Sequence, residues 1–229
     1  MSGAETTPRQ KGPQAARSAP DLRRERFAQD DPQRVTLFLR EARKCSDDEK
    51  YDLAIGHFTD ALGLDPNNQN IFIERGNACW YAGLLGQAIS DFDQALQIGP
   101  DSASVLSSRG QALAEAGRFT EAVVDLQRVI LQAGKPGMSF VVAYSHNGLG
   151  LAYGGLGMFD RALSEFDLSL RQSPGNAWVY FNRGVTYDRM GQYGKALTEF
   201  QQALKNEDPS LPPLKRQAAQ QRLRRTQPR

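Results

Sequence analysis

The sequence has no long hydrophobic run and contains few cysteines. No stretch of the 229 residues approaches the ~20 consecutive apolar residues of a membrane-spanning helix, so we expect no membrane insertion. The N-terminal residues also lack the apolar core of a secretory signal peptide. The two cysteines, Cys45 and Cys79, are therefore expected to be free thiols in a reducing compartment. These features predict a cytoplasmic protein, with the cilium or the nucleus as alternatives.

Motifs of catalysis and of metal or nucleotide binding are missing as well. The sequence contains no HExxH motif, P-loop, paired CxxC or EF-hand loop. Neither of its two histidines, His57 and His146, is accompanied by a nucleophile with a role of its own. The glycines of residues 148–154 superficially resemble a dinucleotide loop, but their spacing is one residue too long and no strand precedes them. We expect no enzyme activity, no metal site and no cofactor.

Charge is unevenly distributed along the chain, although the net charge is only +2. Residues 1–34 are rich in Pro, Gln, Arg, Ser and Ala and predict a disordered or weakly ordered arm. Residues 35–209 contain 21 acidic and 15 basic residues, whereas residues 210–229 contain six basic residues and no acidic one. Such a tail suits nucleic acid or an acidic partner, but it is also typical of a solvated terminus. We disfavour nucleic-acid binding, which would use Lys215, Arg216, Arg222, Arg224 and Arg225.

The sequence does contain a pattern that recurs every 34 residues. It is clearest in residues 76–100, and the same residue types return 34 positions upstream and downstream. In that stretch the recurring residues are Gly76, Gly83, Ala88, Phe92, Ala95 and Pro100. The register shifts by six residues around residues 134–142. Five units result, with the boundaries 35–68, 69–102, 103–136, 143–176 and 177–210.

Each recurrent position has a physical role in a helical hairpin. Glycine at position 8 and alanine at positions 20 and 27 allow helices to approach closely, and large residues at positions 4, 11, 17 and 24 fill the remaining space. Glycine at position 15 suits a left-handed C-cap, and proline at position 32 ends the second helix. Arginines at position 7 and acids at position 23 predict ion pairs that set the register of the hairpins. These pairs are Arg75–Asp91, Arg109–Asp125 and Arg183–Glu199.

The pattern resembles the tetratricopeptide repeat, whose signature of W-x2-L-G-x2-Y, A-x3-F and P extends over 34 residues. The resemblance covers about residues 35–210. It implies an all-α, right-handed solenoid of five antiparallel helix-turn-helix units. Unit one departs most from the signature, since Glu49 replaces the turn glycine, as expected of an edge unit. Residues 211–229 are expected to form a basic capping helix and tail, with an apolar stripe of Leu214, Ala218 and Leu223.

In tetratricopeptide proteins the inner groove is lined by the first helix of each unit, chiefly at positions 2, 5, 9 and 12. Here these positions hold amide and aromatic residues with few charges. Amides hydrogen-bond an extended backbone and exposed aromatics anchor apolar side chains, whereas packing between hairpins is the alternative role for each aromatic. The candidate peptide-binding residues are Ile73, Asn77, Trp80, Tyr81, Gln111, Tyr144, Asn147, Trp178 and Phe181.

The resemblance implies a non-enzymatic scaffold or adaptor that binds a protein segment in the concave groove of the array. Some members of the family bind Hsp70 or Hsp90 through a carboxylate clamp of Lys, Arg and Asn residues. No frame of this chain supplies that cationic cluster, so Hsp70/Hsp90 binding of the clamp type is disfavoured. The frame from unit two, for example, offers Ile73, Asn77, Ser108, Tyr144 and Gly148. The alternative is a structural subunit of a ciliary or cytoskeletal assembly, docking through the array ends or the convex face.

Overall fold

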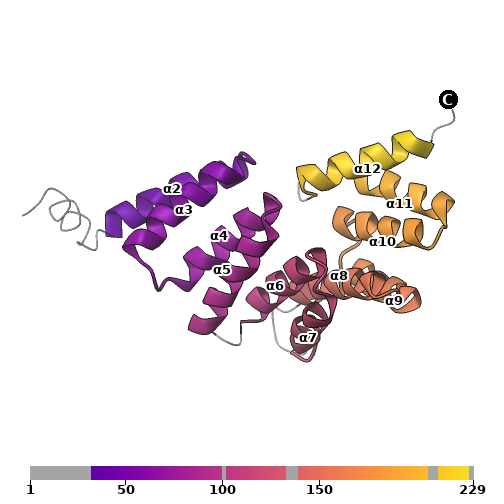
Figure 1. The fold of residues 1–229 in the computed structure, drawn as a ribbon, viewed down its shortest axis with the longest axis horizontal. Helices are drawn as coiled ribbons and strands as arrows, with labels where there is room; N and C mark the ends of the chain where they lie inside the picture. Colours follow the sequence, from indigo (N-terminus) through magenta and orange to yellow (C-terminus); the bar gives the residue numbers. More distant parts are fainter. Residues whose placement is uncertain (1–31, 100–101, 133–138, 206–210, 227–229) are drawn as a thin grey trace, which may run out of the picture.

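The structure, a computed structural model, describes residues 32–99, 102–132, 139–205 and 211–226. Within these ranges the chain forms eleven α-helices and no β-strand, which confirms the predicted all-α architecture. Ten helices pair into five hairpins and an eleventh follows them (Figure 1). The pairs are α2 (Pro32–Asp47) with α3 (Tyr51–Leu64), α4 (Gln69–Tyr81) with α5 (Leu85–Ile98), α6 (Ala103–Glu115) with α7 (Phe119–Ile130), α8 (Ser139–Gly155) with α9 (Phe159–Gln172), and α10 (Ala177–Arg189) with α11 (Tyr193–Lys205), before α12 (Pro213–Thr226).

Successive hairpins stack into a curved array. Figure 1 shows α2 and α3 at one end and α10, α11 and α12 at the other, and the array bends so that the first turn of α12 faces the ends of α4 and α5. The first helices of neighbouring hairpins also contact one another, as α6 does with both α4 and α8. These first helices, α2, α4, α6, α8 and α10, form the inner face of the array.

Two boundaries differ from the even pattern of the sequence. Pro32 already begins α2, inside the predicted arm 1–34, and residues 1–31 lie outside the described part of the chain. The register shift falls before α8, which has 17 residues where α4, α6 and α10 have 13. The added turn of α8 carries Phe140, whose side chain is 72% exposed. No repeat position in the sequence accounts for this aromatic residue.

Close helix crossing at position 8 is confirmed. A Cβ atom placed on the glycine there would lie 2.5 to 2.9 Å from the large side chain at position 24 of the same unit, closer than real contacts allow. Those large side chains are almost completely buried. The two helices of a hairpin are therefore as near as glycine permits. The pairs are Gly76 with Phe92, Gly110 with Leu126, Gly150 with Phe166, and Gly184 with Phe200.

The turn within each hairpin has the same backbone form. The residue at position 15 has a positive φ in every unit, and the next amide donates to the carbonyl five residues earlier, which is the Schellman arrangement. Four units place glycine there, as predicted: Gly83, Gly117, Gly157 and Gly191. In unit one Glu49 adopts φ 59° without glycine's freedom, and Lys50 N still donates to Cys45 O at 2.8 Å. The turn is thus set by its hydrogen bonds as well as by its residue type.

The predicted arginine–acid pairs are confirmed, and each arginine also reaches a second hairpin. Arg109 donates through Nε and Nη2 to Asp125 in its own unit, at 2.7 and 2.8 Å, and through Nη1 to Asp93 of the preceding unit at 2.6 Å. Hydrogen bonds to these carboxylates raise the pKa of Arg109 above its usual range. Arg75 and Arg183 repeat the arrangement, with Thr59 and Asp167 as their contacts in the preceding unit.

Unit four joins its own two helices through different residues. It has Leu149 at position 7, and His146 lies instead with Nδ1 2.7 Å from Glu165 Oε2. One helical turn separates the two positions, so the histidine enters the hairpin interface beside the place where the other units use arginine.

We predict that Gly110→Ala lowers the free energy of unfolding by about 1–3 kcal/mol, because the new methyl group would overlap buried Leu126. Gly56→Ala is the matched control, since nothing lies within 4 Å of a Cβ at that position in α3. It should raise stability by about 0.5–1 kcal/mol through helix propensity. Urea unfolding followed by circular dichroism measures both variants, and equal effects would rule out close crossing as the role of Gly110.

We also predict that Asp91→Ala lowers the free energy of unfolding by about 2 kcal/mol, because Arg75 loses two charged hydrogen bonds in a largely buried site. The control is Glu121→Ala, which breaks the exposed Arg118–Glu121 pair and should leave the urea midpoint unchanged. A stable Asp91→Ala protein would show that these pairs do not hold the hairpins together.

Candidate functional site

The inner face contains two hollows. The first, of about 350 Å³, lies between α2, α3 and α4, and the second, of about 230 Å³, lies between α4, α6 and α8. Asn77 and Tyr81 line both hollows, which makes them one continuous track along the inner face. The first is lined by Arg43, Ser46, Asp47, Glu49, Tyr51, Phe58, Glu74, Asn77, Ala78 and Tyr81. The second is lined by Asn77, Trp80, Tyr81, Ser104, Ser107, Ser108, Phe140, Val141 and Tyr144.

The first hollow is charged. Arg43 donates through Nε and Nη2 to the two carboxylate oxygens of Glu74, both at 2.7 Å. This bidentate pair joins the first helices of units one and two in the lining of the hollow. Asp47 and Glu49 also line it. With three acids and one arginine among its lining residues, the first hollow favours a polar or basic ligand group.

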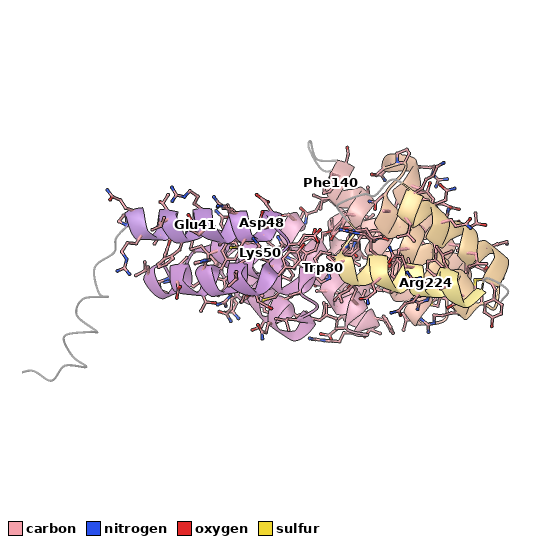
Figure 2. The ribbon with its side chains drawn as sticks, turned by 90° about the horizontal axis from the view of Figure 1, so that it is seen from above. Glu41, Asp48, Lys50, Trp80, Phe140 and Arg224 are labelled. Carbon is pink, nitrogen blue, oxygen red and sulfur yellow. The ribbon has the colours of Figure 1, made fainter. Side chains whose placement is uncertain are left out.

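The second hollow is aromatic and hydroxylated. Phe140 stacks on Tyr144 with the ring centroids 6.2 Å apart and an angle of 11° between the planes. Figure 2 shows Phe140 at the projecting start of α8, and Trp80 deeper in the molecule near the first turn of α12. Three serines from α6 line the same hollow, and Ser107 is hydrogen-bonded to Ser145. This hollow offers apolar rings beside small hydrogen-bonding groups.

Four rings meet where the curve of the array brings α4 and α10 together. Trp80 lies 5.0 Å from Trp178 and 6.1 Å from Tyr144, measured between ring centroids. Tyr81 completes the group at 6.4 Å from Trp178. Trp80 and Trp178 are only 5% and 4% exposed. Burial raises the pKa of Tyr81 and raises that of Tyr144 well above its usual value, so both phenols stay neutral in the physiological range.

The amides predicted to bind a peptide backbone are bonded within the array. Gln111 Nε2 donates to the Tyr144 carbonyl at 2.6 Å. Asn147 Nδ2 donates to Gln111 Oε1 at 3.4 Å, and Asn147 Oδ1 accepts a bond from Asn182 Nδ2 at 3.1 Å. Gln111 and Asn147 are completely buried. This ladder joins α6, α8 and α10 and leaves neither amide on the surface of the groove.

The predicted binding residues thus divide into two groups. Five of them are buried rather than open to the groove, and for the aromatic ones this is the packing role named above as the alternative; these are Trp80, Gln111, Asn147, Trp178 and Phe181. Four remain partly exposed: Ile73, Asn77, Tyr81 and Tyr144. Sequence reasoning missed Phe140, which lies in the register shift, and Arg43 and Glu74, and it considered Ser108 only as a clamp position.

Of the apolar stripe predicted for the capping helix, Ala218 and Leu223 are partly buried against the core, but Leu214 is not. Leu214, assigned to its apolar stripe, is 58% exposed, whereas Leu211 and Ala219 are completely buried. Positions spaced by four residues face the array, and Lys215 falls between the two buried residues at that spacing. Lys215, which the predicted stripe did not include, therefore points toward the array.

Two further observations concern the Cys79 thiol and the length of the helices. Burial raises the pKa of the Cys79 thiol to about 11, and its Sγ lies 3.7 Å from Gln87 Oε1. A protonated, buried thiol is a poor nucleophile. No helix in the described ranges is both long and apolar enough to cross a membrane.

We predict that maleimide at pH 8 modifies Cys45 in the folded protein and spares Cys79, since Cys45 is partly exposed. The raised pKa favours the folded state while the thiol is protonated. This contribution is complete below the unfolded pKa near 9 and is lost as the pH rises through about 11. Mass spectrometry of native and urea-denatured protein counts the labels, and Cys79→Ser controls for assignment. Equal labelling of both thiols at pH 8 would contradict the burial.

Comparisons with known proteins agree with this geometry. Two family models, both described as "Tetratricopeptide repeat", match residues 39–103, 73–138 and 141–206. A MamA crystal structure has 25% identity and a TM-score of 0.55, covering 78% of this chain and 94% of that one. MamA from Desulfovibrio magneticus RS-1 has 18% identity and a TM-score of 0.57, covering 77% and 97%. YrrB, titled a TPR protein with an unusual peptide-binding site, has 22% identity and a TM-score of 0.51, covering 89% and 98%.

No curated protein matches the sequence. The family matches extend over most of the array, and the hairpins, their close crossings and their turns are those of the repeat. The structural neighbours share this fold over nearly their whole length. The chain belongs to the tetratricopeptide repeat family.

Proposed function

We propose that this chain is a non-enzymatic scaffold or adaptor that holds a segment of another protein on its inner face. The continuous track formed by the two hollows carries the proposal, because it joins a charged end to an aromatic end. An extended segment of a few residues fits such a track, with polar or basic groups at Arg43–Glu74 and an apolar side chain at Phe140 and Tyr144.

The character of the inner face supports binding rather than catalysis. The His146 ring is paired with a carboxylate inside a hairpin, and the Cys79 thiol is buried with a raised pKa. The tyrosines near the track are also held neutral by burial. None of these groups is arranged as a nucleophile beside a free base. Asn77, by contrast, lies partly exposed between the two hollows, where its amide can bond an extended backbone.

Selection of a random peptide library displayed on phage against the full-length protein tests the proposal. We expect enriched peptides to share a pattern with an apolar residue. Phe140→Ala and Asn77→Ala should each weaken their binding about tenfold, the loss that corresponds to one anchoring contact. Fluorescence anisotropy with labelled peptides measures the affinities.

Tyr193→Ala is the matched control, because Tyr193 is another exposed aromatic near a helix start but lies on α11, outside the track. It should bind the selected peptides as the wild-type protein does. The track is not the recognition surface if the selected peptides share no pattern, or if their affinity is unchanged by both Asn77→Ala and Phe140→Ala.

A further inference from the structure

The first turn of α12 contacts three hairpins that precede it by at least 100 residues. Arg216 Nη2 donates to Glu49 Oε1 at 3.0 Å, and Lys215 Nζ donates to Glu115 Oε1 at 2.8 Å. The Leu214 side chain lies against Gly83, with its Cδ1 3.3 Å from the place of a Cβ. Residues 214–216 therefore extend over the ends of α2, α4 and α6 (Figure 1).

Lys215 lies in an enclosure of rings and carboxylate. Its Nζ is 4.7 Å from the centroid of the Trp178 ring and 5.5 Å from that of Phe181, while Glu115 accepts its hydrogen bond. The side chains of Lys215 and Glu115 are each 15% exposed. Aromatic faces and a carboxylate attract an ammonium group most strongly where water is excluded. We call Trp178, Phe181 and Glu115 the cation cage.

A helix that only covers the apolar face of the last hairpin would be expected to have an apolar residue, and not a lysine, at position 215. Leu211 and Ala219 are completely buried on either side of Lys215 at four-residue spacing, so a leucine at position 215 would complete an apolar stripe. Burying an ammonium group is unfavourable unless its partners replace the lost water. The cage supplies those partners, and its residues come from α6 and α10 rather than from α12 itself. The array therefore presents a preformed site for a lysine.

The cage is continuous with the track. Trp178 contacts Trp80, Tyr81 and Tyr144, and each of these three also lines the second hollow. Glu49, the partner of Arg216, lines the first hollow. The first turn of α12 thus covers one side of the surface to which we assign segment binding.

We propose that residues 211–216, Leu-Pro-Pro-Leu-Lys-Arg, are an intramolecular ligand, and that the cation cage recognises the lysine of a similar basic segment in a partner protein. This inference rests on the proposed function, because it assigns a partner chemistry to the same inner face. The partner segment competes with the tethered one, so the array binds it only when its concentration exceeds the effective concentration of the tether. The excess of acidic over basic residues in positions 35–209 favours the approach of a basic segment.

A labelled peptide of residues 209–218 serves as the probe, with the full-length chain and fluorescence anisotropy. We expect Lys215→Gln to bind the peptide at least tenfold tighter than the wild-type protein, because the tethered competitor has lost its cation while Ala219 still packs on the array. A peptide carrying the same Lys→Gln change should bind at least tenfold more weakly. Adding Glu115→Gln to the Lys215→Gln protein should also remove its increase in affinity for the unmodified peptide. Arg224→Gln, an equal charge change at an exposed position of α12, is the control and should match the wild type.

A second measurement uses the wild-type chain alone. Both tryptophans of the sequence, Trp80 and Trp178, lie in the ring group beside Lys215. Excess peptide should displace the first turn of α12 and shift the tryptophan emission, and the Lys→Gln peptide should not. The inference would be overturned if the affinity for the peptide did not change with the Lys→Gln substitution in the peptide or with Glu115→Gln in the protein. Self-association of the Lys215→Gln protein that the peptide does not reverse would overturn it as well.

The two proposals fail separately. Library peptides that depend on Asn77 and Phe140, together with no binding of the basic peptide, would refute the intramolecular ligand and leave the track intact. Binding of the basic peptide that depends on Glu115, without any peptide that depends on Phe140, would instead refute the track as the main recognition surface.

Discussion

The close crossing of two helices at a glycine is the constraint from which the rest of the array follows. A missing side chain at position 8 lets the large residue at position 24 fill the hairpin, as Phe92 does against Gly76. This proximity places arginine at position 7 within reach of a carboxylate on the second helix and of a group on the preceding hairpin. One steric condition, repeated in units two to five, thereby sets the packing of each hairpin and, in units two, three and five, also its attachment to the preceding hairpin.

The period of the sequence predicted this part of the structure well, because the contacts concerned are local and repeat. Gly110 has its neighbour at the same repeat position as Gly76 does, so the contacts of one unit predict those of the next. The arginine pairs were predictable for the same reason. His146 was not, since it reaches Glu165 from a different position of its unit, and only the geometry of α8 against α9 brings the two together.

The inner face was harder to predict, because it depends on the curvature of the whole array. Whether Trp80 is open or covered depends on where α10 lies, almost one hundred residues later, and no spacing within a unit encodes that distance. Gln111 and Asn147 carry the residue types of a peptide-binding row, but their partners are each other. Residues between the units, such as Phe140, had no repeat position from which a role could be read.

The contact between Arg216 and Glu49 has a consequence for folding. In an open solenoid each repeat contacts only its neighbours, so the ends fray independently and contact order is low. Here a hydrogen-bonded ion pair joins residues 167 positions apart and ties the last helix to the turn of the first hairpin. Such a closure adds loop entropy to the folding barrier but couples the two ends. Together with Lys215–Glu115 and the contact of Leu214 with Gly83, the pair favours unfolding of the array as one cooperative unit rather than as a row of separate hairpins.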